Sequence, residues 1–146
     1  MDLKDWLTDE QIKKINGHLE TMAREKIAQS LRNILPPIGR TRREFMYQVD
    51  IGLFRQHMIQ YFTVTFRDII LPDVFPNGIP ESFEPTSKIR ERIFYAGVVT
   101  TVRQMFLRKV LFELYDNMDR RWQLSNPSIH TMPPTRMGGY KQYIEK

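Results

Sequence analysis

Apolar residues recur at helical spacing along three stretches of the chain. In residues 12–34 they stand mostly three or four positions apart, which places them on one face of a helix. Thr8 and Gln11 form a capping-box pattern in front of this stretch. The pattern predicts a first helix that begins after Thr8 and ends at "LPPIG", because two consecutive prolines cannot continue a helix.

A second helix is predicted from about Arg42 to about Leu71. Thr41 and Glu44 stand at the cap and third positions of another capping box. The apolar residues that follow cover more than one stripe, which is typical of a helix buried on most of its sides. Residues 59–66 are rich in β-branched and aromatic types that suit a strand equally well, so the sequence leaves them open between helix and strand.

The third stretch of helical spacing covers residues 88–124. An unbroken helix of this length would measure roughly 55 Å at about 1.5 Å per residue. A compact domain of 146 residues is only about 40 Å across. We therefore expect the helix either to bend or break around Gly97, or to overhang the domain and pack on another molecule.

Two segments lack any apolar period. Residues 72–87 contain four prolines, an Asn-Gly pair and three carboxylates without a cation, a composition that predicts turns and extended chain. A loop of this length in a compact domain is typical of a binding loop. Holding residues 125–146 in one conformation would cost on the order of 20–40 kcal/mol. Their own apolar side chains return less than that, so they need a surface to dock on.

The sequence thus predicts a mainly α-helical protein, a bundle of about three long helices. The helical domain would span residues 1–124, with the proline-rich loop 72–87 inserted between helices. Residues 125–146 would form an extended C-terminal arm. Hydrophobic residues make up 41% of the chain, enough for one sizeable core, and 146 residues suit one domain better than two.

Composition also argues against several classes of protein. The chain has no cysteine, so we expect neither a disulfide framework nor a thiolate metal site, which fits a reducing compartment or an intracellularly assembled particle better than secretion. The acidic start "MDLKDWLTDE" does not resemble an export signal. The longest uncharged runs fall short of the ~18 apolar residues that cross a bilayer, so we expect no transmembrane helix.

No arrangement of side chains in the sequence identifies a reaction. The chain has three histidines: His18, His57 and His130. They lie in different segments, and none has a partner at the spacing of known metal-binding motifs. Glu113, Asp116 and Asp119 share a helix face and could bind a cation, but Lys109 and Arg120 each stand four residues from one of them, and a solvated ladder of ion pairs explains these residues better. We therefore expect a non-enzymatic protein without a metal or cofactor.

Positive charge is concentrated at two predicted helix starts. Six cations stand there: Arg40, Arg42, Arg43, Lys88, Arg90 and Arg92. Because cations at a helix N-terminus oppose the helix dipole, we expect a compensating anion, either a phosphate or a protein carboxylate. The alternative is that Glu44 and Glu91 partly offset these charges and solvent screens the rest.

Apolar residues of the loop and the arm are the expected contacts with a partner. They are Phe75 and Phe83 in the loop, and Ile129, Met132, Met137, Tyr140, Tyr143 and Ile144 in the arm. In layout the chain resembles the helical head-to-tail adaptor or neck subunits of tailed bacteriophages, which share its small size, helical body and nonhelical C-terminal arm. The resemblance implies a structural subunit of a virion or cytoplasmic assembly, in which loop and arm contact neighbouring subunits of a homo- or hetero-oligomer.

A second function stays open on the basis of charge. The chain carries a net charge of +5, which permits a small nucleic-acid-binding or ribonucleoprotein component that places the six cations on phosphates. No helix-turn-helix, zinc-finger or RNP-type motif accompanies the charge. The sequence therefore favours a partner made of protein subunits.

Overall fold

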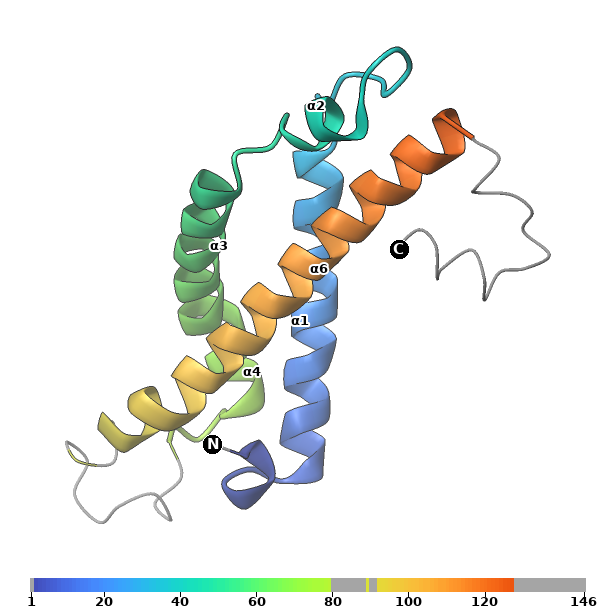
Figure 1. Ribbon diagram of the computed structural model, residues 1–146. Coiled ribbons are helices and arrows are strands. Elements are labelled where there is room, and N and C mark those ends of the chain that lie inside the picture. The colour runs from blue at the N-terminus through green and yellow to red at the C-terminus, as the bar shows by residue number, and fades with distance from the viewer. Residues whose placement is uncertain (1, 80–88, 90–91, 128–146) are drawn as a thin grey trace.

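The structure is a computed structural model that describes residues 2–79, 89 and 92–127. Over these residues the chain is mainly α-helical, as the sequence predicts, and contains no strand. Three long helices, α1, α3 and α6, form an elongated body, and shorter helical segments join them (Figure 1). Helices α1 and α6 point the same way along the body, α3 points the opposite way, and α6 crosses α1.

The first helix, α1, covers Asp9–Ser30 and begins at the predicted capping box. Thr8 Oγ1 accepts from the Gln11 N–H at 3.2 Å, and Gln11 Oε1 accepts from the Thr8 N–H at 3.0 Å. A short 3-10 turn, η1 (Leu3–Asp5), precedes the helix. One stripe of α1 is buried, formed by Ile15, Leu19, Met22, Ala23 and Ile27.

The second predicted helix is broken near its start. Helix α2 covers only Arg42–Met46, behind the predicted capping box at Thr41, and α3 covers Ile51–Thr65. Asp50 caps α3, because its side chain accepts from a backbone amide of the first turn at 3.0 Å. The prediction of one continuous helix from Arg42 to Leu71 is therefore wrong, because the apolar pattern continues through the break and Asp50 was not recognised as an N-cap.

Residues 59–66, which the sequence left open, are helical. They lead into a π-helical turn, η2 (Phe66–Ile70), and then into α4 (Leu71–Val74). Pro72 stands in the first turn of α4, where a missing N–H costs little. The predicted loop 72–87 therefore begins later than expected, and the part of it from residue 80 onwards lies outside the described residues.

The third predicted helix widens at Gly97 and does not break there. Helical structure is present at residues 92–93, continues as a π-helical turn, η4 (Phe94–Val99), and passes into α6 (Thr100–Ser125). The Thr100 hydroxyl donates to the Tyr95 carbonyl at 3.0 Å, five residues back. The irregularity expected around Gly97 is therefore present, as a π-helical turn within a continuous helix. Helix α6 ends close to the predicted domain boundary at residue 124, and residues 128–146 of the predicted arm lie outside the described residues.

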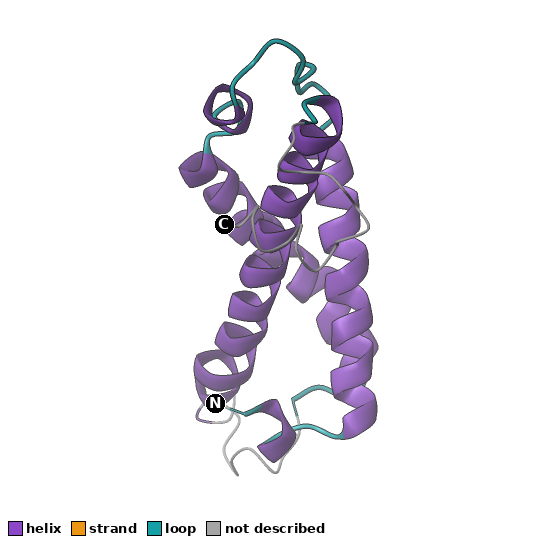
Figure 2. Ribbon diagram, turned by 45° about the vertical axis from the view of Figure 1, so that its right-hand side comes forward, coloured by secondary structure: helices purple, strands orange, loops and turns teal. Residues whose placement is uncertain are grey.

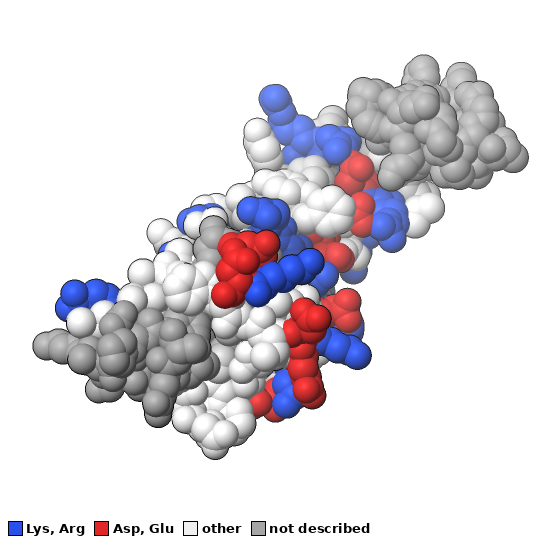
Figure 3. All heavy atoms as spheres, turned by 90° about the horizontal axis from the view of Figure 1, so that it is seen from below, with Lys and Arg blue, Asp and Glu red and all other residues white. Residues whose placement is uncertain are grey.

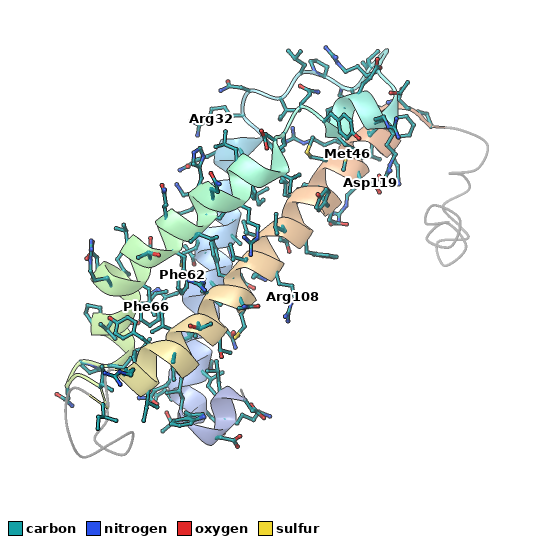
Figure 4. The ribbon with its side chains drawn as sticks, turned by 60° about the vertical axis from the view of Figure 1, so that its left-hand side comes forward. Arg32, Met46, Phe62, Phe66, Arg108 and Asp119 are labelled. Atoms are coloured by element: carbon teal, nitrogen blue, oxygen red, sulfur yellow. The ribbon has the colours of Figure 1, made fainter. Side chains whose placement is uncertain are left out.

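Aromatic side chains join the elements in the core. The rings of Phe62 (α3) and Phe106 (α6) stack with centroids 5.9 Å apart, and Phe62 also lies 5.5 Å from Phe66 (Figure 4). The rings of Phe94 and Phe75 pack in a T-shaped arrangement with their centroids 5.1 Å apart. The centroid of the Phe94 ring also lies 6.5 Å from that of Phe66. Because Phe66 and Phe94 come from the two π-helical turns, these turns face each other across the core.

The connections between helices lie at the two ends of the body (Figure 2). Residues 31–41 and α2 form one end, which we call the α2 end, and η1 and α4 lie toward the other (Figure 1). Within the described ranges, no helix has both the length and the apolar character needed to span a membrane.

Candidate interaction surfaces

The link between α1 and α2, residues 31–41, is held against the body by side chains. Gln48 Oε1 accepts from the Leu35 N–H at 2.8 Å, and Gln48 Nε2 donates to the Leu35 carbonyl at 3.3 Å. Trp122 Nε1 of α6 donates to the Arg40 carbonyl at 3.0 Å. These bonds reach from the link to the end of α2 and to α6, so the link has a defined conformation.

This ordered link presents apolar side chains to solvent. Leu35 is 53% exposed, Ile38 is 73% exposed, and Tyr47 at the end of α2 is 74% exposed. The Arg43 guanidinium lies over the Tyr47 ring, 5.9 Å from its centroid. We call Leu35, Ile38, Arg40, Arg43 and Tyr47 the α2-end surface. Single exposed apolar residues are ordinary, but several on one ordered end are typical of a contact site.

The three arginines at the start of α2 have different partners. Arg42 Nε donates to Asp119 Oδ1 of α6 at 2.6 Å. Asp119 is labelled in Figure 4. Arg40 Nε donates to the Pro36 carbonyl at 3.1 Å. The anion expected at this helix start is therefore, for Arg42, a carboxylate of the same chain. Arg40 and Arg43 stay in the candidate surface.

The remaining predicted contact residues divide into two groups. Arg92 is described and lies exposed at the start of the third helical stretch. The following predicted residues lie outside the described residues: Phe83, Lys88, Arg90, Ile129, Met132, Met137, Tyr140, Tyr143 and Ile144. Their role in contacting partners stays a prediction.

Phe75 must be removed from the predicted contact residues. Its side chain is 4% exposed and packs edge-on against Phe94 in the core. Phe75 was predicted to lie in a loop because the preceding helix was expected to end at about Leu71, before Pro72. Helix α4 instead carries the chain to Val74, and the next residue, Phe75, enters the core.

His18 bridges α1 and α4. Its Nε2 lies 2.7 Å from Asp73 Oδ2. This hydrogen bond is the largest cause that lowers the pKa of the Asp73 carboxyl below its ordinary value, and the charge of Lys14 lowers it further. The described part of the chain holds no group of three side chains that could bind a metal ion. What the pair does is join α1 to α4.

Two of the three acidic residues of α6, Asp116 and Asp119, are engaged in ion pairs. Asp116 accepts from Arg120, four residues later, as the sequence predicts. Asp119 accepts from Arg42 and, at 2.9 Å, from Gln123 Nε2. Of the predicted ladder, the pair of Asp116 and Arg120 is therefore present, whereas no ion pair joins Lys109 and Glu113 in this described stretch of α6.

Shallow grooves follow the helix boundaries. One of about 680 Å³ lies between η1 and the first half of α6, lined in part by Leu3, Lys4, Met105 and Arg108. Others of about 540 Å³ and 530 Å³ lie between α1 and α6 and between α1 and α3. The mixture of aliphatic and charged side chains in the first groove suits contact with a polypeptide.

Charges of both signs are interspersed on one face of the described residues (Figure 3). In the described atoms of the face in Figure 3, Lys and Arg are interspersed with Asp and Glu and form no continuous basic band. A surface that follows a nucleic-acid backbone needs such a band. This face therefore fits a protein partner better.

Leu35, Ile38 and Tyr47 were not predicted as contacts. Leu35 and Ile38 stand in the segment that ends the first predicted helix, and Tyr47 falls within the range of the second. The available signal was "LPPIG" followed closely by arginines, since apolar residues beside two prolines belong to no helical stripe.

The chain was compared with protein-family models, with curated proteins and with solved structures, and none of these matches it. No function is therefore transferred from a relative. The surfaces described above are the basis for a functional proposal.

Proposed function

We propose that this protein is a non-enzymatic structural subunit that joins other protein subunits in a larger assembly. The α2-end surface carries the proposal. In the described residues the body has its own apolar core, and no buried side-chain nitrogen or oxygen lacks a hydrogen-bond partner. The exposed Leu35, Ile38 and Tyr47 are therefore not needed to complete the domain.

The free energy available at this surface fits a protein contact. Burying the exposed parts of Leu35, Ile38 and Tyr47 would contribute about 3–6 kcal/mol before the costs of association. Those costs are of similar size, so a stable contact needs further area. Arg40 and Arg43 would add charge-assisted hydrogen bonds to carboxylates of a partner.

Further area can come from the C-terminal residues. Helix α6 ends at Ser125 beside the α2 end, where Trp122 is bonded to the Arg40 carbonyl. The predicted arm, 125–146, therefore leaves the body at the same end as the α2-end surface. In this proposal the arm and the loop residue Phe83 contact neighbouring subunits, with the layout of a phage head-to-tail adaptor or neck protein, in a virion or cytoplasmic assembly.

The proposal is tested on the chain in its native complex. The double variant Ile38→Glu/Tyr47→Glu should leave the helical circular dichroism unchanged but remove the chain from the complex, as measured by light scattering of the purified complex. Deletion of residues 128–146 should have the same effect. The matched control is Ile69→Glu, which changes a 54% exposed residue of η2. Recovery of the natural chain only as a monomer, without a stoichiometric protein partner, would contradict the proposal.

A nucleic-acid-binding or ribonucleoprotein role is the second candidate. The observation that favours it is the segment 32–43, which contains four arginines and no carboxylate. Affinity for RNA or DNA should then fall steeply as salt concentration rises, since bound cations release counterions. Affinity that does not change with salt would remove this candidate.

A further inference from the structure

The α2 end of the body carries an excess of positive charge beside its exposed apolar side chains. Residues 32–50 and 116–125 line this end (Figure 1), and they contain six arginines and four carboxylates, a net charge of +2. The four carboxylates all have partners in the chain: Glu44 and Asp50 accept from backbone amides, Asp116 accepts from Arg120, and Asp119 accepts from Arg42. No ion pair within the described residues involves the other four arginines, Arg32, Arg40, Arg43 and Arg121. The arginines of the α2-end surface are therefore available to carboxylates of a partner.

The two longest stretches outside the described residues differ in the sign of their charge. Residues 128–146 contain three cations and one carboxylate, so they carry the same sign as the α2 end. Residues 80–87 contain Glu81 and Glu84 and no cation, and the first cation after them is Lys88. Opposite charges favour contact between two surfaces, and like charges oppose it. Charge therefore selects residues 80–87 over residues 128–146 as the segment that fits the α2-end surface.

The acidic segment also contains a large apolar residue. Its sequence from residue 80 to residue 85 is "PESFEP", in which Phe83 stands between the two glutamates. An aromatic ring is a typical anchor for an apolar contact, and neighbouring carboxylates can bind arginines around it. The prolines at both ends restrict the backbone of the unbound chain, so the segment loses less entropy when it docks.

The α2-end surface lies out of reach of this segment in the same chain. Phe75 packs against Phe94 near the start of the third helical stretch, whereas Trp122 contacts the link at the α2 end. The helical stretch from Phe94 to Trp122 is roughly 40 Å long at about 1.5 Å per residue. The chain from Phe75 to Phe83 spans at most about 29 Å when fully extended. The turn in which the Gly78 N–H donates to the Phe75 carbonyl shortens this span further.

We propose that the α2-end surface binds residues 80–85 of a second copy of this chain. Phe83 of that copy enters the apolar part of the surface, and Glu81 and Glu84 bind its arginines. This inference rests on the proposed function and names one partner in the assembly. Because the two contacting parts differ and belong to opposite ends of the body, the copies join head to tail. Such contacts repeat from copy to copy and either close into a ring or continue as a filament.

Reversal of charge on each side tests the contact on the purified full-length chain. One variant is Arg40→Glu/Arg43→Glu, and the other is Glu81→Arg/Glu84→Arg. The natural chain should self-associate with rising concentration in sedimentation equilibrium. Either variant alone should associate at least about tenfold more weakly, because like charges then meet at every contact. In an equal mixture each surface meets opposite charge on the other variant, so association should return to within about threefold of the natural chain.

Matched variants separate the contact from general effects of charge and exposure. Arg24→Glu/Arg108→Glu makes the same change in net charge at exposed positions of α1 and α6 outside the surface, and it should associate like the natural chain. Phe83→Ala should weaken association at least several-fold. Phe112→Ala, which changes a 65% exposed phenylalanine of α6, should not. All of these variants should keep the helical circular dichroism of the natural chain.

Four results would overturn the proposal. They are a natural chain that stays monomeric up to about 1 mM, a dissociation constant that corresponds to barely 4 kcal/mol, a mixture of the two charge variants that does not associate, an effect of Phe112→Ala equal to that of Phe83→Ala, and RNA binding by a monomeric chain that Arg40→Glu/Arg43→Glu abolishes. The last result would assign the surface to phosphates.

The chain's own C-terminal residues are a further occupant that experiment can distinguish. If residues 128–146 cover the surface in the same chain, the thiol of a Tyr47→Cys variant is protected from alkylation in the monomer, and deletion of 128–146 exposes it. That result also overturns the inference. The proposed function is judged separately in the native complex. If Ile38→Glu/Tyr47→Glu leaves the complex while the purified natural chain stays monomeric, the proposed function stands and this inference falls.

Discussion

Two leucines of α6 differ widely in exposure and allow a direct test of burial in the core. Leu114 is 0% exposed and Leu124 is 79% exposed. Each can be replaced by alanine, one at a time. Because both belong to the same helix, the change in helix propensity is similarly small for both. The difference between the two variants therefore measures burial.

The expected difference follows from the core position of Leu114. Truncation removes buried methyl groups and leaves a cavity in the middle of the body, which costs about 3–4 kcal/mol in well-packed sites. Truncation of Leu124 should change the free energy of unfolding by less than about 0.5 kcal/mol. For a domain of this size, the loss at Leu114 corresponds to a decrease in Tm of roughly 10 °C.

Urea unfolding followed by far-ultraviolet circular dichroism measures both variants against the natural chain. Dilute protein keeps self-association from contributing to the measured stability. Equal slopes of free energy against urea confirm that only stability has changed. If the two variants differ by less than about 1 kcal/mol, the assignment of Leu114 to the core is wrong.

Three further predictions concern the His18–Asp73 bridge and two glycines. The pKa of Asp73 is lowered in the folded chain, so its carboxylate stabilises the fold above its ordinary pKa, and this contribution is lost as pH falls through the lowered value. Asp73→Asn should therefore reduce the loss of stability on acidification, measured as urea midpoints across a pH series. Gly39→Ala should destabilise by about 1–2 kcal/mol because Gly39 has φ 79°. Gly17→Ala in α1, where an added Cβ meets nothing, should stabilise by about 0.5–1 kcal/mol in the same assay.

Much of the fold could be predicted because its signals are local. The caps at Thr8 and Thr41 are where the sequence places them, since a capping box involves residues only three positions apart. The irregular turn at Gly97 was also anticipated. The break before α3 was missed although its signal, Asp50, is local too. In that case the continuous apolar pattern outweighed a single polar residue.

The candidate surfaces were less predictable because they depend on contacts between distant residues. Leu35 and Ile38 are exposed because Gln48 and Trp122 hold the link to α2 in place, and Trp122 lies 82 residues from Arg40 in sequence. No spacing rule connects such positions. The predicted arm residues lie outside the described part of the chain, so their contacts stay predictions.

The sequence alone determined the helical class and the position of several helix ends, because hydrogen bonds and side-chain spacing within a helix act over a few residues. Only the tertiary structure decided which side of α6 is buried. Large apolar residues stand at helical spacing on both sides of this helix, so periodicity cannot choose between them. The choice was made by α1 and α3, which pack on the side of Phe106 and Leu114 and leave Phe112 and Tyr115 outside.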